Sequence, residues 1–99
     1  MARAVSLSEA MLSAARIGDW TGVASLEGER SQMLEACLTH AETDPATERV
    51  MASALEKMIV INDALVSVAS DAQAELGSAL AKARQGRRAA TAYLDAAMN

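Results

Sequence analysis

Cys37 and His40 are the two residues whose chemistry and spacing could support catalysis. They lie three positions apart near the predicted end of a helix, a spacing at which helical side chains meet. A thiol and an imidazole in that position could act as a nucleophile and its base. The sequence offers no third orienting group and no glycine-rich oxyanion site, so a buried cysteine and a histidine favoured by the helix dipole are the preferred interpretation. We therefore predict that the protein is not an enzyme.

Metal and cofactor sites lack the residues that they need. One cysteine and one histidine are too few for a structural zinc site, and no Glu-x-x-His spacing occurs. The chain contains neither a phosphate-binding glycine loop nor a dinucleotide fingerprint. The sequence thus predicts no metal and no cofactor, which leaves binding as the class of function to consider.

Charge is distributed unevenly along the chain. Residues 17–48 carry seven acidic residues and one basic residue, whereas four of the nine basic residues fall in 82–88. The net charge of −4 argues against nucleic acid or an anionic membrane as the partner. A solvated helix end is the favoured interpretation of the basic cluster, and pairing with the acidic segment, within the molecule or across a partner, is the alternative.

Alanine dominates the composition and favours helices. The 99 residues include 23 alanines, and only Trp20 and Tyr93 are aromatic. Strands need the β-branched and aromatic residues that are scarce here, so we predict an all-α fold in a single domain covering 1–99. One cysteine and the lack of a long uncharged apolar run predict a cytoplasmic protein without membrane insertion.

Capping residues predict the first two helices. Ser6 or Ser8 can cap the first, and Gly18 can end it, since glycine accepts the left-handed conformation of a helix C-terminus. Asp19 then caps the second helix, at whose start Trp20 is expected to be largely buried. The predicted ranges are 7–17 and 20–39.

Asp44 and Pro45 mark the start of the third helix, because aspartate is a preferred cap and proline is favoured at the first helical position. The next strong stop is Gly86, and Gly77 lies inside the helix. We therefore predict a long helix over 45–85 and a short one over 87–97.

The long helix has a seven-residue apolar repeat. Nine of ten positions from 51 to 83, in alternating steps of four and three, are apolar. Such a repeat predicts a supercoiled seam against another helix, and hence an antiparallel bundle of three to four helices. The stretch 58–61 is apolar nearly all round. Burial in the bundle is favoured over docking of another protein for this stretch.

Asn62 is the one polar residue on that seam. It can fix the register of the helices, or it can face a groove and bind a partner backbone. The residues that we predict for partner binding surround it: Met58, Ile59, Ile61, Asn62, Leu65 and Val66.

Taken in order, these features resemble the FliT family of flagellar type III export chaperones. The resemblance spans about residues 7–94. It is carried by Asp19-Trp20, Leu26-Glu27, Arg30, Leu34, Leu55, Met58-Ile59, Asn62, Leu65, Leu76, Leu80, Arg84, the run Gly86-Arg-Arg-Ala-Ala and Tyr93. The chain departs from the family in its short length, its few aromatic residues and the stretch Asp71-Ala-Gln73.

The resemblance implies a chaperone that binds the C-terminal region of the filament-cap protein and escorts it to the export apparatus. It also implies that the export gate, export ATPase components and, in some bacteria, a transcription activator are partners. The last segment would be a lid over the binding face, formed by Arg87, Arg88, Tyr93 and Leu94. The alternative is a self-associating coiled-coil adaptor without a secretion role, which should be an obligate oligomer, and the sequence leaves a homodimer open for the chaperone as well.

Overall fold

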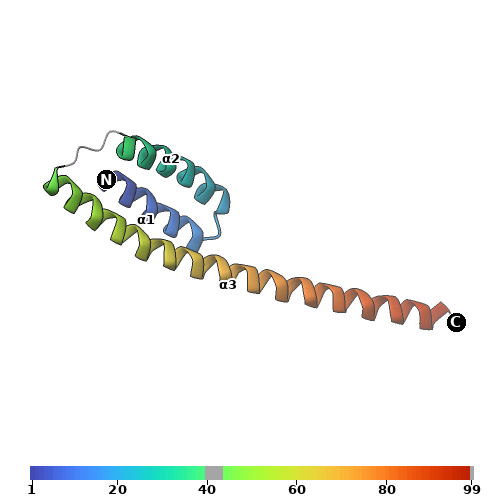
Figure 1. The fold of residues 1–99 in the computed structure, drawn as a ribbon. Helices are drawn as coiled ribbons and strands as arrows, with labels where there is room; N and C mark the ends of the chain where they lie inside the picture. Colours follow the sequence, from blue (N-terminus) through green and yellow to red (C-terminus); the bar gives the residue numbers. More distant parts are fainter. Residues whose placement is uncertain (40–43, 99) are drawn as a thin grey trace. The chain divides into compact units, whose positions relative to one another are not determined.

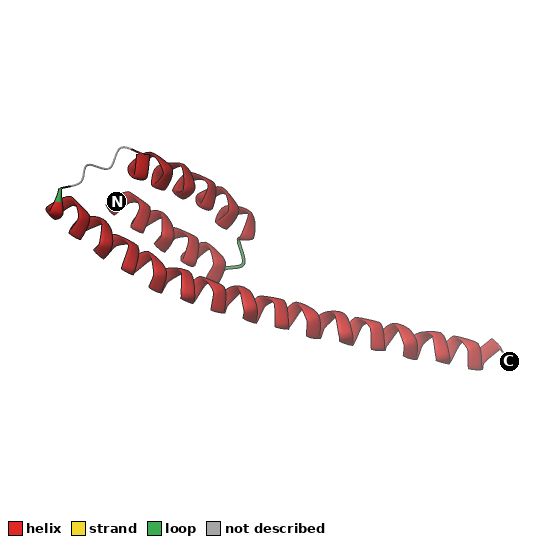
Figure 2. Cartoon of the chain, viewed as in Figure 1, coloured by secondary structure: helices red, strands yellow, loops and turns green. Residues whose placement is uncertain are grey.

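A computed structural model of the protein describes residues 1–39 and 44–98, which form three helices (Figures 1 and 2). They are α1 (Ala2–Arg16), α2 (Trp20–Thr39) and α3 (Pro45–Met98). The predicted all-α fold with one long helix is confirmed. The chain divides into two compact units, Met1–Ala69 and Ser70–Asn99, which are described separately below.

A glycine ends α1, as the sequence predicts. Gly18 has a φ of 76°, and its N–H donates to the Ala15 carbonyl at 3.0 Å. The N–H of Asp19 donates to the Ala14 carbonyl at 2.9 Å, so two carbonyls of the last turn are paired. The Asp19 carboxylate then caps α2 by accepting from the N–H of Gly22 at 3.0 Å. A Cβ on Gly22 would collide with this carboxylate.

Asp44 caps α3 from the position that the sequence predicts. Its Oδ1 accepts from the N–H of Ala46 at 3.3 Å, and its Oδ2 accepts from the Thr47 hydroxyl at 3.4 Å. Pro45 is the first residue of the helix, a position whose N–H has no acceptor within the helix, so the N–H that proline lacks is not needed.

The start of α1 differs from the sequence-based expectation. The helix begins at Ala2 rather than near residue 7, so Ser6 and Ser8 both lie inside it and neither is its cap. Ser8 is fully buried, and its hydroxyl donates to the carbonyl of Ala4 at 3.0 Å. A serine can occupy a helix interior when its hydroxyl bonds the preceding turn in this way.

α3 continues through the predicted break at Gly86, so the two ranges predicted as 45–85 and 87–97 are one helix. Glycine costs about 1 kcal/mol relative to alanine in a helix interior. The alanine, lysine, arginine and glutamine residues around Gly86 are strong helix formers and outweigh that cost. Among the described residues, only Gly18 has the positive φ of a glycine helix end. No described helix combines the length and apolarity needed to cross a membrane.

The core of the first unit is built from all three helices. Figure 1 shows α1 lying between α2 and the first part of α3. The buried apolar residues come from α1 and α3, and α2 contributes half-buried side chains that pack against them. The buried residues are Ala4, Met11, Ala15, Ala54 and Met58, and the half-buried residues from α2 are Met33 and Leu34.

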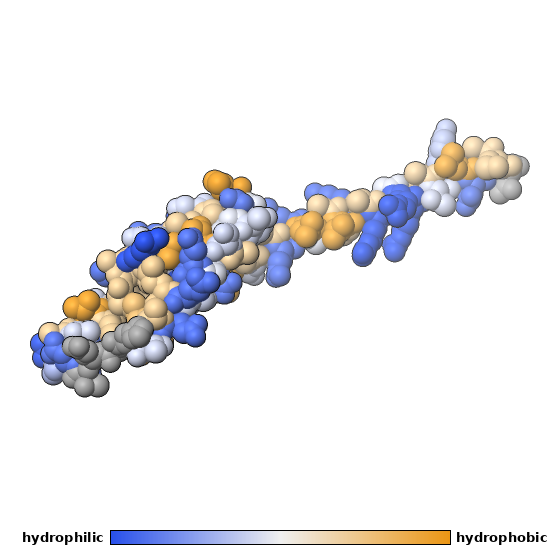
Figure 3. Space-filling model, turned by 90° about the horizontal axis from the view of Figure 1, so that it is seen from above, coloured by the Kyte–Doolittle hydropathy of each residue, from blue (hydrophilic) through white to orange (hydrophobic). Residues whose placement is uncertain are grey.

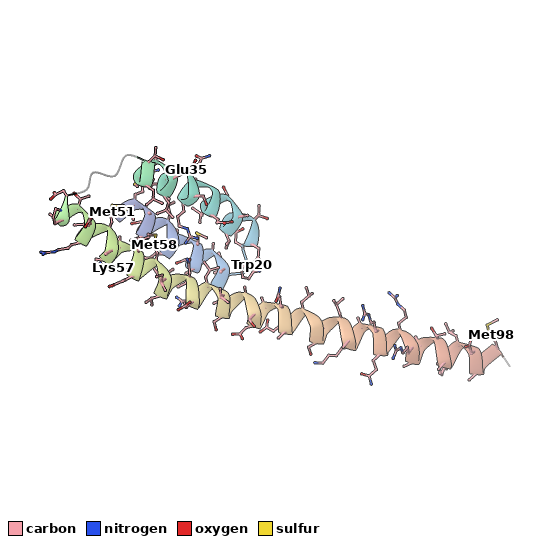
Figure 4. The ribbon with its side chains drawn as sticks, in the orientation of Figure 1. Trp20, Glu35, Met51, Lys57, Met58 and Met98 are labelled. Atoms are coloured by element: carbon pink, nitrogen blue, oxygen red, sulfur yellow. The ribbon has the colours of Figure 1, made fainter. Side chains whose placement is uncertain are left out.

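Trp20 is less buried than predicted. Its side chain is 38% exposed, so the expectation that it is largely buried is wrong. It is the first residue of α2, next to the turn that joins α1 and α2 (Figure 4). A residue at the end of a bundle has neighbours on fewer sides than one in mid-helix, which explains its exposure.

Candidate partner-binding surface

One arginine connects the three helices of the first unit. Arg30 on α2 donates through one guanidinium nitrogen to the Ser8 hydroxyl on α1 at 3.0 Å. The same nitrogen donates to the Asn62 side-chain oxygen on α3 at 2.7 Å. The shorter distance is typical of a hydrogen bond with a charged donor. We call Ser8, Arg30 and Asn62 the polar cluster.

The polar cluster gives Asn62 a partner inside the bundle. A polar side chain on an apolar seam destabilises the fold unless it is hydrogen-bonded, and the guanidinium supplies that bond. Of the two interpretations that the sequence leaves open, this contact favours a role in helix register. Sequence reasoning missed the connection because Arg30 lies 22 residues from Ser8 and 32 from Asn62. In the sequence, only the family resemblance singles out Arg30.

The predicted partner-binding residues do not share one exposed face. Met58 is 4% exposed and belongs to the core, so a partner can contact it only if the helices separate. Ile61, Asn62 and Leu65 are half-buried. Ile59 and Val66 are 59% and 66% exposed, respectively, and are free to contact a partner.

Three exposed apolar residues form a strip on α3. Leu55 is 40% exposed and lies four residues before Ile59, which lies seven before Val66. Residues four and seven apart lie on the same side of a helix. We call Leu55, Ile59 and Val66 the α3 strip. Figure 3 shows apolar side chains at the surface of the first unit among polar ones.

The four predicted lid residues belong to the second unit. Arg87, Arg88, Tyr93 and Leu94 are all helical and exposed, and the exposed fractions of Tyr93 and Leu94 are 75% and 59%. Both buried residues of α3, Ala54 and Met58, lie in the first unit. The lid role therefore stays a prediction.

Of the two residues considered for catalysis, Cys37 and His40, the structure describes one. Cys37 is a free, half-buried thiol, and His40 lies outside the described residues. Across 1–39 and 44–98, no three side chains of His, Cys, Asp or Glu gather where they could hold a metal ion.

Comparison with known proteins identifies a family that covers most of the chain. A family model described as "Flagellar protein FliT" matches residues 1–95 and confirms the resemblance seen in the sequence. No curated protein and no solved structure gives a significant match.

Proposed function

The chain belongs to the FliT family of flagellar proteins, and from that premise we propose that it binds the C-terminal region of the filament-cap protein and escorts it to the type III export apparatus. FliT proteins are flagellar export chaperones that bind partner proteins, and the family is not known as one of enzymes. The function proposed for this chain is accordingly binding without catalysis, carried out in the cytoplasm.

The α3 strip is the observation that best supports this proposal. Leu55, Ile59 and Val66 expose a line of apolar side chains on a helix whose other exposed positions include charged residues such as Glu56 and Asp63. An apolar line at helical spacing suits an amphipathic helix of a partner, which can bury its own apolar side against it. Asn62 lies beside the strip, so a partner that docks there would contact the edge of the polar cluster.

A charge on the α3 strip is expected to weaken cap-protein binding. Val66→Asp should raise the dissociation constant for a C-terminal cap-protein fragment at least about ten-fold, because a carboxylate is costly to bury in an apolar contact. Isothermal titration calorimetry measures this change. Val60→Asp is the matched control, because Val60 is 69% exposed and lies on another side of α3. Equal losses for the two variants would rule out the α3 strip as the binding site.

We also propose that residues 87–98 act as a lid that lowers the apparent affinity for the cap protein. The segment exposes Tyr93 and Leu94, which could cover an apolar surface, and holds neither of the buried residues of α3. Gly77 and Gly86 would allow α3 to bend, since glycine weakens a helix by about 1 kcal/mol relative to alanine.

Removing the lid is expected to tighten binding. Truncation after Gln85 should leave the first unit folded, and should strengthen binding of the cap-protein fragment about ten-fold if about nine-tenths of the intact molecules are closed. Gly86→Ala should also tighten binding of the cap-protein fragment, because it stiffens α3. Gly28→Ala in α2 is the control and should leave binding unchanged. Weaker or equal binding by a truncated protein that is still folded would contradict the lid.

The remaining family partners are proposed on the family relationship alone. They are the export gate, the export ATPase components and, in some bacteria, a transcription activator. A homodimer and the alternative function of a self-associating adaptor draw support from a set of exposed apolar side chains in residues 76–98. They include Leu76, Leu80, Leu94 and Met98, which are 61%, 48%, 59% and 85% exposed. A monomer in sedimentation equilibrium would rule out the adaptor, because the adaptor requires a stable oligomer in the absence of any other protein.

A further inference from the structure

The first unit contains an apolar groove that none of the proposed roles uses. It lies between the start of α1 and the first turns of α3 and has a volume of about 450 Å³. This volume falls within the range of about 300–1,000 Å³ that is typical of binding pockets. The groove is lined by Met1, Ala2, Val5, Arg49, Val50, Ser53, Ala54 and Lys57.

The lining divides into an apolar floor and a basic edge. Arg49, Ser53 and Lys57 are spaced four residues apart, so they form one row along α3. Val50 and Ala54 form the next row, and Val5 of α1 lies across the groove from them. Two cationic side chains therefore line one side of the apolar groove, although the net charge of the chain is −4.

We propose that this groove docks an acidic amphipathic segment of another protein, with an apolar side chain on the floor and carboxylates beside Arg49 and Lys57. Burial of the apolar side chain would supply affinity, and the paired charges would select acidic partners and speed association. The inference goes beyond the proposed function and does not depend on it.

The groove and the α3 strip are separate surfaces. Lys57 at the edge of the groove and Ile59 in the strip are two residues apart, which places their side chains on nearly opposite sides of the helix. A substitution on one surface therefore leaves the other unchanged, and the two docking sites can be tested independently.

Fluorescence anisotropy with designed peptides tests the proposal on the intact chain. The probe is a short labelled helical peptide with leucines on one side flanked by glutamates, compared with counterparts that carry glutamine or lysine in place of glutamate. The glutamate peptide should bind at least about five-fold more tightly than the glutamine peptide, and the lysine peptide should bind most weakly. Raising the salt concentration should remove most of this preference.

Three variants assign the binding to the groove. Arg49→Gln/Lys57→Gln should reduce binding of the glutamate peptide to the level of the glutamine peptide. Arg16→Gln/Lys82→Gln changes the net charge equally and should keep the affinity within about two-fold. Val50→Asp should reduce binding most, and it should not unfold the protein because Val50 is 64% exposed.

Four results would overturn the proposal: equal affinity for the glutamate and glutamine peptides, no loss of binding in Val50→Asp, equal losses in the groove and control double variants, or no binding up to about 1 mM peptide. A dimer in the native protein that Val50→Asp converts to monomer would assign the groove to a second copy of this chain instead. Ile59→Asp separates this site from the cap-protein site, since it should spare peptide binding in the groove.

Discussion

Replacing Met58 by alanine is expected to lower the free energy of unfolding by about 2–5 kcal/mol, the largest effect of any single substitution considered. Met58 is 4% exposed and contacts the cluster formed by Ala4 and Ala54. Of the buried apolar residues described, only Met11 and Met58 have large side chains. Truncating one of the two therefore removes much of the core and leaves a cavity that alanine neighbours cannot fill.

The single tryptophan makes this loss measurable. Trp20 belongs to the first unit, so its fluorescence in a urea titration reports on the bundle that contains Met58. Met98→Ala is the matched control, because Met98 is 85% exposed and its truncation should change stability by no more than about 0.5 kcal/mol. A loss below about 1 kcal/mol in Met58→Ala would mean that Met58 does not hold the helices together.

The second large effect is expected at Asn62. Asn62→Leu should lower the free energy of unfolding by about 1.5–3 kcal/mol, although it places an apolar residue on an apolar seam. The substitution removes the acceptor of the 2.7 Å hydrogen bond from Arg30 and leaves a half-buried guanidinium with one partner fewer. Without that bond, leucine on the seam would be expected to stabilise the bundle.

A double-mutant cycle isolates this contribution. Arg30→Met keeps an unbranched aliphatic stem and removes the charged guanidinium. The double variant Arg30→Met/Asn62→Leu should lose less free energy of unfolding than the two single variants lose together. Replacing both hydrogen-bond partners by apolar groups can be nearly neutral. Strictly additive losses would show that Arg30 and Asn62 do not interact in solution.

The helix ends could be predicted where a local residue determines them. Gly18, Asp19 and Asp44 each act through hydrogen bonds to residues within five positions, so the printed sequence contains both partners. Gly86 shows the limit of this reasoning. The sequence marks it as a stop, but a glycine ends a helix only where the chain turns away, and there α3 continues.

The contacts between helices could not be predicted in the same way. The seven-residue repeat identifies the inner side of α3, yet it continues to Ala83, whereas half-buried positions end at Ala72. α1 and α2 have 15 and 20 residues and can cover only part of a helix of 54. The polar cluster and the groove depend on which turns of α1 and α2 lie opposite α3, and no local pattern specifies that alignment.

α2 contains no fully buried residue, although it completes the three-helix unit. Ala4 on α1 and Ala54 and Met58 on α3 pack together directly, so α1 and α3 share contacts that do not require α2. The backbone amides of α2 should therefore exchange with deuterium through a local opening that needs less free energy than global unfolding. In that open state the hydrogen bond between Arg30 and Asn62 is broken. The surfaces of α1 and α3 that α2 covers become accessible to solvent, while α1 and α3 still contact each other. The bundle would thus unfold in steps, and α2 would separate before α1 and α3 come apart.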